Sequence, residues 1–270
     1  MTERTIPVDA FGPIALNLTL NAGTIRITVD PGLKQARVVL RTNATSGPSA
    51  DAIRDTAVSL RGQNLTVRVP DVEGIGGSTT IRMGNSTMTF SGGSGVQIIN
   101  GNVHVTGHGG GKVFVNGREV TPGGTADTSG PTPIEAVISL PAGSMALLST
   151  HTARTTVSGE LARLDYDATS GSLSADRVGE LDATITSGSV NVRQVTGSLT
   201  ANLTSGNLAI GSYSGSDARL NLTSGNVSMA ATPQATGRLA VNATSGNAHV
   251  TGAAHLNVRR RATSGYVHIS

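Results

Sequence analysis

The sequence predicts an all-β protein whose C-terminal half is a β-solenoid of stacked rungs. Three observations lead to this prediction: a recurring Thr-Ser-Gly triplet, apolar columns that keep step with it, and a composition that disfavours helix. The chain of 270 residues is 37% hydrophobic but only 2% aromatic, and it contains 35 glycines. A core without many aromatics is filled by Leu, Val, Ile and Ala in thin layers, while abundant Gly, Thr and Ser favour strands and tight turns.

The triplet marks the repeat. It begins at Thr169, Thr186, Thr204, Thr223, Thr244 and Thr263, so the successive spacings are 17, 18, 19, 21 and 19 residues. A period near 19 residues is typical of stacked repeats. Glycine accepts a positive φ, and Ser and Thr hydroxyls can bond to backbone groups at a bend. We therefore predict that each triplet forms a corner of a rung, with hydroxyl ladders along the edge.

Apolar columns flank the triplet on both sides. The residues five and one before each Thr, and four and six after it, are apolar, whereas the residue two before it is polar. The first column reads Leu164, Leu181, Leu199, Ala218, Leu239 and Val258. Alternation with a period of two indicates strands with one face inward and one outward. The solenoid requires Leu181, Leu199 and Leu239 to share one core.

The N-terminal half carries weaker signs of the same architecture. Residues 16–29 and 137–143 alternate around an Ala-Gly turn. Asn100-Gly101 and Asn116-Gly117 lie between apolar stretches, a pattern typical of β-hairpins. We therefore expect three parts: residues 1–70 as a β cap or first layers, residues 71–130 as Gly-rich hairpins, and residues 131–270 as the regular solenoid.

These motifs resemble a known family. The turn from Leu140 to Gly143, followed by successive Thr-Ser-Gly-x-Val/Leu units, is similar to the bacterial putative-adhesin family of β-strand repeat proteins of unknown function. The resemblance covers residues 134–270, and residues 14–45 more loosely. It implies a right-handed single-stranded β-helix and brings no catalytic residues. A more distant resemblance is to bactofilins, which are cytoplasmic β-helical proteins that polymerise end to end.

Charged residues supply a few candidate contacts. Asp165 and Asp182 occupy the same position on successive rungs, where a carboxylate pair could bind a cation or do acid–base chemistry. His249 and His268 share an outward column on the last two rungs, and Arg259, Arg260 and Arg261 form a basic cluster near the end. Each set also fits an ordinary solvated surface. All seven are candidates for partner contact; we assign no catalytic, cofactor-binding or metal-binding residue.

The sequence favours a non-enzymatic scaffold or adhesin-like binding module. No nucleophile elbow, phosphate-binding loop or dinucleotide fingerprint occurs. One alternative is end-to-end self-assembly through the solenoid ends, and a remote one is a carbohydrate-active β-helix enzyme. A glycan or other surface ligand is the expected partner class; nucleic acid and a membrane span are not expected, and neither is a cofactor. Without a signal peptide, the default location is cytoplasmic, with non-classical export as the alternative.

Overall fold

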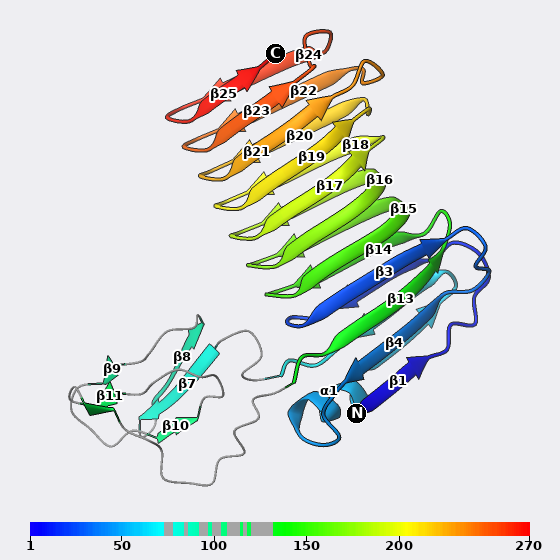
Figure 1. Ribbon diagram of the computed structural model, residues 1–270, viewed down its shortest axis with the longest axis vertical. Coiled ribbons are helices and arrows are strands. Elements are labelled where there is room, and N and C mark those ends of the chain that lie inside the picture. Colours follow the sequence, from blue (N-terminus) through cyan, green and yellow to red (C-terminus); the bar gives the residue numbers. More distant parts are fainter. Residues whose placement is uncertain are drawn as a thin grey trace.

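The computed structural model is a two-layered β-solenoid (Figure 1). It describes residues 1–72 and 132–270, together with the backbone of six short strands between them. One sheet of 19 strands winds around the core, so that each regular rung places one strand in each layer. We call the layer whose strands lead into the Thr-Ser-Gly corners layer 1, and the layer whose strands follow those corners layer 2.

Neighbouring strands in each layer are hydrogen-bonded to one another, and β15 and β16 are long enough to run through both layers. In order along the stack, layer 1 contains β5 (Ala57–Arg61), β6 (Asn64–Arg68), β2 (Ala15–Thr19), β14 (Met145–Thr150), the second halves of β15 (Arg154–Ala168) and β16 (Ser172–Ile185), β18 (Ser198–Leu203), β20 (Asp217–Leu222), β22 (Arg238–Ala243) and β24 (Asn257–Ala262). Layer 2 contains β1 (Thr2–Ile6), β4 (Arg37–Thr42), β13 (Glu135–Pro141), β3 (Thr24–Asp30), the first halves of β15 and β16, β17 (Ser189–Val195), β19 (Asn207–Tyr213), β21 (Asn226–Ala231), β23 (Asn247–Thr251) and β25 (Tyr266–Ile269).

The register of the strands confirms the predicted columns. Leu181 lies beside Leu199, and Ala218 lies between Leu199 and Leu239 in the same column. All four side chains are at most 2% exposed and belong to one hydrophobic core. Two aromatic side chains, Tyr166 and Tyr213, are also buried in this core, which the expectation of a purely aliphatic interior did not include. Burial raises the pKa of the Tyr213 hydroxyl to about 12.

The first strands are interleaved with later ones. Strand β13 lies between β3 and β4, and β14 lies between β2 and β15, so segments far apart in the sequence share the same layers. Three antiparallel pairs end the parallel stack on this side: β13 with β4 and β4 with β1 in layer 2, and β6 with β5 in layer 1. Helix α1 (Pro48–Arg54) contacts β1 and β4 and buries Ala50, Ala52 and Ile53. The N-terminal end of the core is therefore covered.

Two ion pairs hold β13 in place between its neighbours. The Glu135 carboxylate lies 2.8 Å from Nε of Arg26 on β3 and 2.7 Å from Nε of Arg41 on β4. The hydrogen bond from Arg41 is the main reason that the pKa of Glu135 is lowered, and it outweighs the opposing effect of burial. The carboxylate is thus stabilised in its charged form.

We expect Glu135→Gln to lower the free energy of unfolding at pH 7 by at most about 1 kcal/mol, the upper range for a partly exposed ion pair. Because the folded-state pKa of Glu135 lies below the unfolded one, its contribution is present above about pH 4 and is lost as pH falls through the folded-state value. Urea unfolding of both proteins at pH 7 and pH 3 measures this difference. An unchanged gap at pH 3 would contradict an electrostatic role for Glu135.

The corner glycines are required for a reason other than the predicted one. The glycines with positive φ in the described chain include Gly23, Gly143 and Gly237, but none belongs to a Thr-Ser-Gly triplet. Instead, a Cβ atom on Gly188, Gly225 or Gly265 would collide with the backbone carbonyl oxygen of the corner glycine one rung earlier. The rungs approach so closely at this corner that only a hydrogen atom fits. The expectation of a positive φ was wrong here.

The corner backbone is bonded from rung to rung. From the second corner onward, the amide of the corner Ser donates to the carbonyl oxygen of the preceding corner Thr, as in Ser187 to Thr169 and Ser224 to Thr204, both at 2.7 Å. The corner amides therefore do not depend on side-chain hydroxyls. In the described rungs, asparagine side chains form hydrogen-bonded ladders, while the corner threonines lie in a row along the edge.

The six strands between residues 78 and 119 form two small sheets. Strand β8 (Ser86–Ser91) pairs antiparallel with β7 (Ser78–Met83), which also pairs with β10 (His104–Thr106). In the other sheet, β11 (Phe114–Val115) pairs antiparallel with β12 (Arg118–Glu119) and parallel with β9 (Gln97–Ile98).

The hairpin turns predicted in this segment, Asn100-Gly101 and Asn116-Gly117, lie outside the described residues. The strands flanking Asn116-Gly117 pair as a hairpin requires. On either side of Asn100-Gly101, β9 pairs with β11 and β10 pairs with β7, and the hairpin predicted there stays a prediction. Alternation in the sequence predicted these strands but did not choose their partners. No helix within the described residues has the length and apolar character needed to cross a membrane.

Candidate functional site

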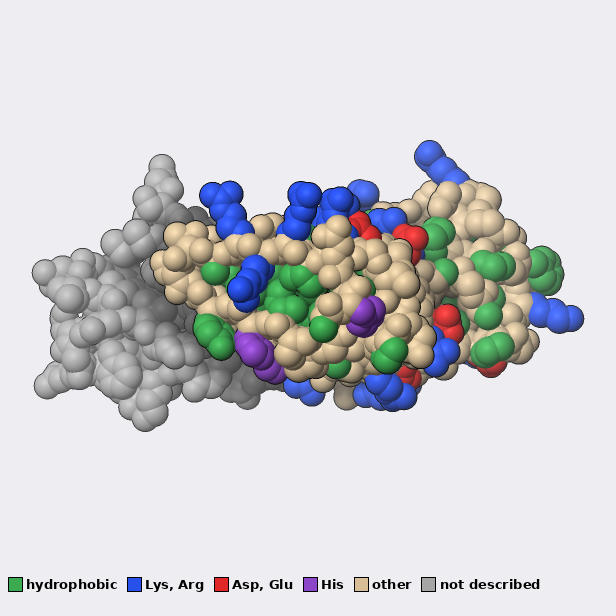
Figure 2. All heavy atoms as spheres, turned by 90° about the horizontal axis from the view of Figure 1, so that it is seen from above, with side chains coloured by type: hydrophobic (Ala, Val, Ile, Leu, Met, Phe, Trp, Pro, Cys, Tyr) green, Lys and Arg blue, Asp and Glu red, His purple; other side chains and the backbone are tan. Residues whose placement is uncertain are grey.

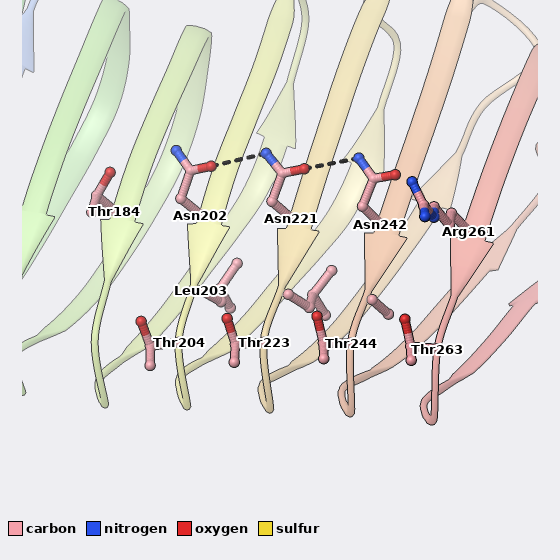
Figure 3. A pocket seen from close by; sticks show the side chains of 12 residues that line it. Thr184, Asn202, Leu203, Thr204, Asn221, Thr223, Asn242, Thr244, Arg261 and Thr263 are labelled. Carbon is pink, nitrogen blue, oxygen red and sulfur yellow. Dashed lines mark hydrogen bonds between the residues drawn. The ribbon is translucent and has the colours of Figure 1, made fainter.

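A ladder of asparagine amides runs along the outer face of layer 1. The side-chain amide of Asn221 donates to Oδ1 of Asn202 at 2.9 Å, and that of Asn242 donates to Oδ1 of Asn221 at 3.0 Å (Figure 3). The three residues come from β18, β20 and β22 and are in register. The parallel pairing brings identical side chains to neighbouring positions, and each amide therefore orients the next one.

The ladder forms one wall of an open groove of about 650 Å³. The opposite wall is the row of corner threonines Thr204, Thr223, Thr244 and Thr263, and Arg261 stands at the C-terminal end (Figure 3). The groove thus offers amide and hydroxyl groups at a strand spacing of about 4.8 Å, with a single charged residue in its lining. It is a regular, polar and nearly neutral surface.

Layer 2 carries a second amide ladder outside this groove. Asn247 donates to Asn226 at 3.1 Å, and Asn226 donates to Asn207 at 3.0 Å. A second groove, of about 620 Å³, is lined by the charged residues Glu160, Asp176, Arg177 and Arg193 among others. These charges largely satisfy one another, since Arg193 pairs with Asp176 at 2.7 Å and Arg177 with Glu160 at 3.3 Å. The groove of layer 1 therefore has fewer of its polar groups engaged in ion pairs within the chain than this second groove has.

The predicted acidic pair is brought together. Asp165 and Asp182 are direct neighbours in the register of β15 and β16. Arg163 donates to the Asp165 carboxylate at 2.9 Å and lies 3.4 Å from Glu180. Burial, followed by the charge of Asp165, raises the pKa of Asp182, while Arg163 opposes this shift. The next rung carries Thr200 in the same column, so the acidic strip covers two rungs only.

The predicted histidine pair is also brought together, but on the other layer. The rings of His249 and His268 stack with centroids 5.1 Å apart and an angle of 9° between their planes. Tyr266 lies parallel to His268, with ring centroids 6.3 Å apart. Among the described residues, no group of three or more His, Cys, Asp and Glu is arranged to hold a metal ion. The stack is an exposed aromatic strip on the last two rungs.

The arginine cluster is split between the two sides of β24. Arg259 and Arg261 continue the outward columns of Ala240 and Asn242, whereas Arg260 continues the inward column of Val241. Figure 2 looks onto this end of the stack and shows apolar side chains between the layers, with basic side chains around them. Arg260 therefore puts a charge where the earlier rungs have a buried aliphatic side chain.

The structure places the seven predicted residues on three different surfaces. Asp165 and Asp182 share the outer face of layer 1 with Arg259 and Arg261, the acids near its middle and the arginines on its last strand, while the histidines lie on layer 2 and Arg260 faces inward. The amide ladder was not recognised from the sequence. Its signal was the polar column two residues before the corner, where Asn recurs on three successive rungs.

Stacked rungs that place one strand in each of two layers around a single core define the repeat architecture known as a β-solenoid. The chain belongs to the Toastrack DUF4097 family, whose model matches residues 26–270. This match extends over the regular rungs and most of the interleaved N-terminal strands, which confirms the family resemblance seen in the corner motifs.

Several solved structures are similar to this chain. A putative adhesin from Bacteroides fragilis is 10% identical over 99% of this chain and 96% of its own, with a TM-score of 0.52. A putative lipid binding protein from Parabacteroides distasonis is 13% identical over 100% and 97%, with a TM-score of 0.48. A putative adhesin from Parabacteroides merdae is 11% identical over 100% and 95%, with a TM-score of 0.44. No curated protein gives a significant match, and no enzyme family is evident among these matches.

Proposed function

We propose that this protein is a non-enzymatic, adhesin-like binding module whose binding surface is the outer face of layer 1. The observation that carries the proposal is the groove between the amide ladder and the corner threonines. Each Asn amide has two N–H donors and an oxygen with two lone pairs. The central residue, Asn221, uses one donor and one lone pair within the ladder, so a donor and an acceptor remain for a ligand.

The expected ligand is a neutral, hydroxyl-rich polymer such as a glycan. Hydroxyl groups both donate and accept, which matches the alternating capacity of amides and threonines in the groove. The groups are held by the strand ladder and by their neighbours, so a ligand would order few side chains on binding. A repetitive ligand can use several rungs at once, and weak contacts then add along the groove.

Asn221→Leu is expected to weaken binding to a soluble neutral polysaccharide by about tenfold or more, since it removes groove donors and acceptors at the centre of the ladder. Asn226→Leu is the matched control, because it makes the same change in the ladder of layer 2. Affinity electrophoresis in gels containing a β-glucan, a xylan or a dextran measures the retardation. Absence of retardation by all three, or equal losses in both variants, would count against the groove.

Catalysis by the acidic pair is the remote alternative. Asp165 is held by Arg163 and lines with it a groove of about 350 Å³ over β14, β2 and β6. Asp182 is not part of that lining and the acidic column stops at Thr200, so the two carboxylates do not line one substrate groove together. Turnover of one of these polysaccharides that disappears in Asp165→Ala or Asp182→Ala would overturn the non-enzymatic proposal.

End-to-end self-assembly is the other alternative, and the structure offers it less support. Helix α1 and the antiparallel strands cover the N-terminal end of the core. At the other end, stacking of a further rung on β24 would bury the guanidinium of Arg260. An inward-pointing charge of this kind is a common means of discouraging edge-to-edge pairing of strands.

A further inference from the structure

The outer face of layer 1 is divided by charge along the stack. Along the six rungs from β15 to β24, the first two carry four carboxylates and one guanidinium, a formal charge of −3, and the last two carry three guanidiniums, a formal charge of +3. The two middle rungs hold Asp217 and Arg219, which pair with each other at 2.7 Å, and otherwise uncharged side chains. The acidic set is Asp165, Asp167, Glu180 and Asp182 with Arg163; the basic set is Arg238, Arg259 and Arg261.

We propose that this face binds the same face of a second copy of the chain, in an antiparallel dimer whose two-fold axis runs parallel to the strands between β18 and β20. The inference rests on the proposed function in taking this face as the binding surface, and it makes a second copy of the chain a competitor of the polysaccharide for the same groove. A two-fold axis makes an interface self-complementary, so every contact occurs twice. One half of the face must therefore complement the other half.

Two of the outward columns meet this condition at their ends. Rotation about this axis reverses the order of rungs and leaves each column opposite itself. In the register of the layer, Asp167 and Arg261 end one column, and Asp165 and Arg259 end the next. Asp167 therefore faces Arg261 of the second copy, and Asp165 faces its Arg259.

The inner rungs agree with the same axis. Glu180 on the second rung faces Arg238 on the fifth rung of the second copy, and Asn202 faces Asn221 beside the axis. The amides there retain donors and acceptors that can bond across the interface. A two-fold axis along the stack would instead oppose like rungs and bring acids against acids, so the charges select one of the two arrangements.

Three of the charged side chains that would meet across the interface are exposed and can pair with the second copy. Among the described residues, no ion pair within 4.0 Å involves Asp167, Arg259 or Arg261, and all three side chains are exposed. Six rungs at about 4.8 Å and five to six residues per strand give about 600 Å² per copy, or about 1,200 Å² in both. This area lies at the lower end of specific interfaces, so we expect a dimer with a dissociation constant in the micromolar range.

Sedimentation equilibrium of residues 1–270 at about 1 to 300 µM tests the proposal. We expect a monomer–dimer equilibrium that weakens at least tenfold between low salt and about 0.5 M NaCl. Asp167→Arg and Arg261→Asp should each weaken self-association at least tenfold, and an equimolar mixture of the two variants should restore it as a heterodimer. The control Arg154→Asp makes the same charge reversal on exposed layer 2 and should change nothing.

The orientation has its own test, because the chain contains no cysteine. Mixed under mild oxidation, Asn202→Cys and Asn221→Cys proteins should form a disulfide-linked dimer, whereas Asn226→Cys on layer 2 should not join either of them. A monomer at every concentration, failure of the charge-reversed mixture to associate, or equal weakening by Arg154→Asp would overturn the dimer. If the protein is a monomer and Asn221→Leu still weakens polysaccharide binding, the proposed function stands and the dimer is wrong. If the protein is a dimer that binds none of the polysaccharides, the dimer stands and the proposed glycan ligand is wrong.

Discussion

Gly225→Ala is expected to lower the free energy of unfolding by about 3 kcal/mol. The added Cβ would meet the carbonyl oxygen of Gly206 on the preceding rung and would lie 3.2 Å from Cβ of Leu203. Both obstacles belong to the tightly stacked corner. There the backbone amide of Asn226 donates to the same carbonyl oxygen of Gly206 at 3.1 Å. The backbone cannot withdraw without breaking this bond, so the strain has no simple release.

Gly32→Ala is the matched control for this prediction. Like Gly225, Gly32 lacks a left-handed φ, but its nearest obstacle is the movable carboxylate of Asp30 at 3.3 Å. We expect a change of about 0.5 kcal/mol or less. Urea unfolding followed by circular dichroism compares the two variants with the parent protein. Equal stabilities for Gly225→Ala and Gly32→Ala would show that the corner relaxes around a methyl group.

Leu199→Ala is expected to cost about 2 to 5 kcal/mol, the range for a large-to-small change in a packed core. Leu199 is fully buried and lies between Leu181 and Ala218 in its column. Because each rung is covered only by its neighbours, a cavity there weakens the packing on both sides.

Leu147→Ala makes the same chemical change in the same layer at a side chain that is 41% exposed. Its expected cost is below about 1 kcal/mol, because less apolar surface is returned to water and no cavity forms. Thermal unfolding of the two variants measures the contrast. Similar losses of stability would mean that the column of Leu199 is not the interior of the stack.

The regular rungs could be predicted from sequence because the same apolar pattern recurs at the same distance from each corner. Leu164, Leu181, Leu199 and Leu239 stand at the same distance from their corners, and the structure places them in one column. The interleaving of β13 and β14 with the first strands could not be predicted in this way. Those strands pair across more than 100 residues, and alternation alone does not select a partner among similar strands.

The chemistry of the face was predictable only in part. The acidic and basic residues were visible, and Asp165, Asp182, Arg259 and Arg261 do lie on one face. The inward direction of Arg260 follows from the alternation of β24, which a cluster of three like residues obscures. The amide ladder depends on bond geometry between rungs, which the recurrence of Asn suggests but does not establish.

The position of β13 between β3 and β4 has a consequence for the order of folding during synthesis. Residues 1–72 leave the ribosome before the strand that joins their layer 2 exists, so β3 must wait for a partner more than 100 residues later in the chain. Contacts of such long range form slowly. Each later rung packs on the rung that was synthesised just before it. We therefore expect folding of this protein to begin late during synthesis and then to proceed quickly, one rung after another.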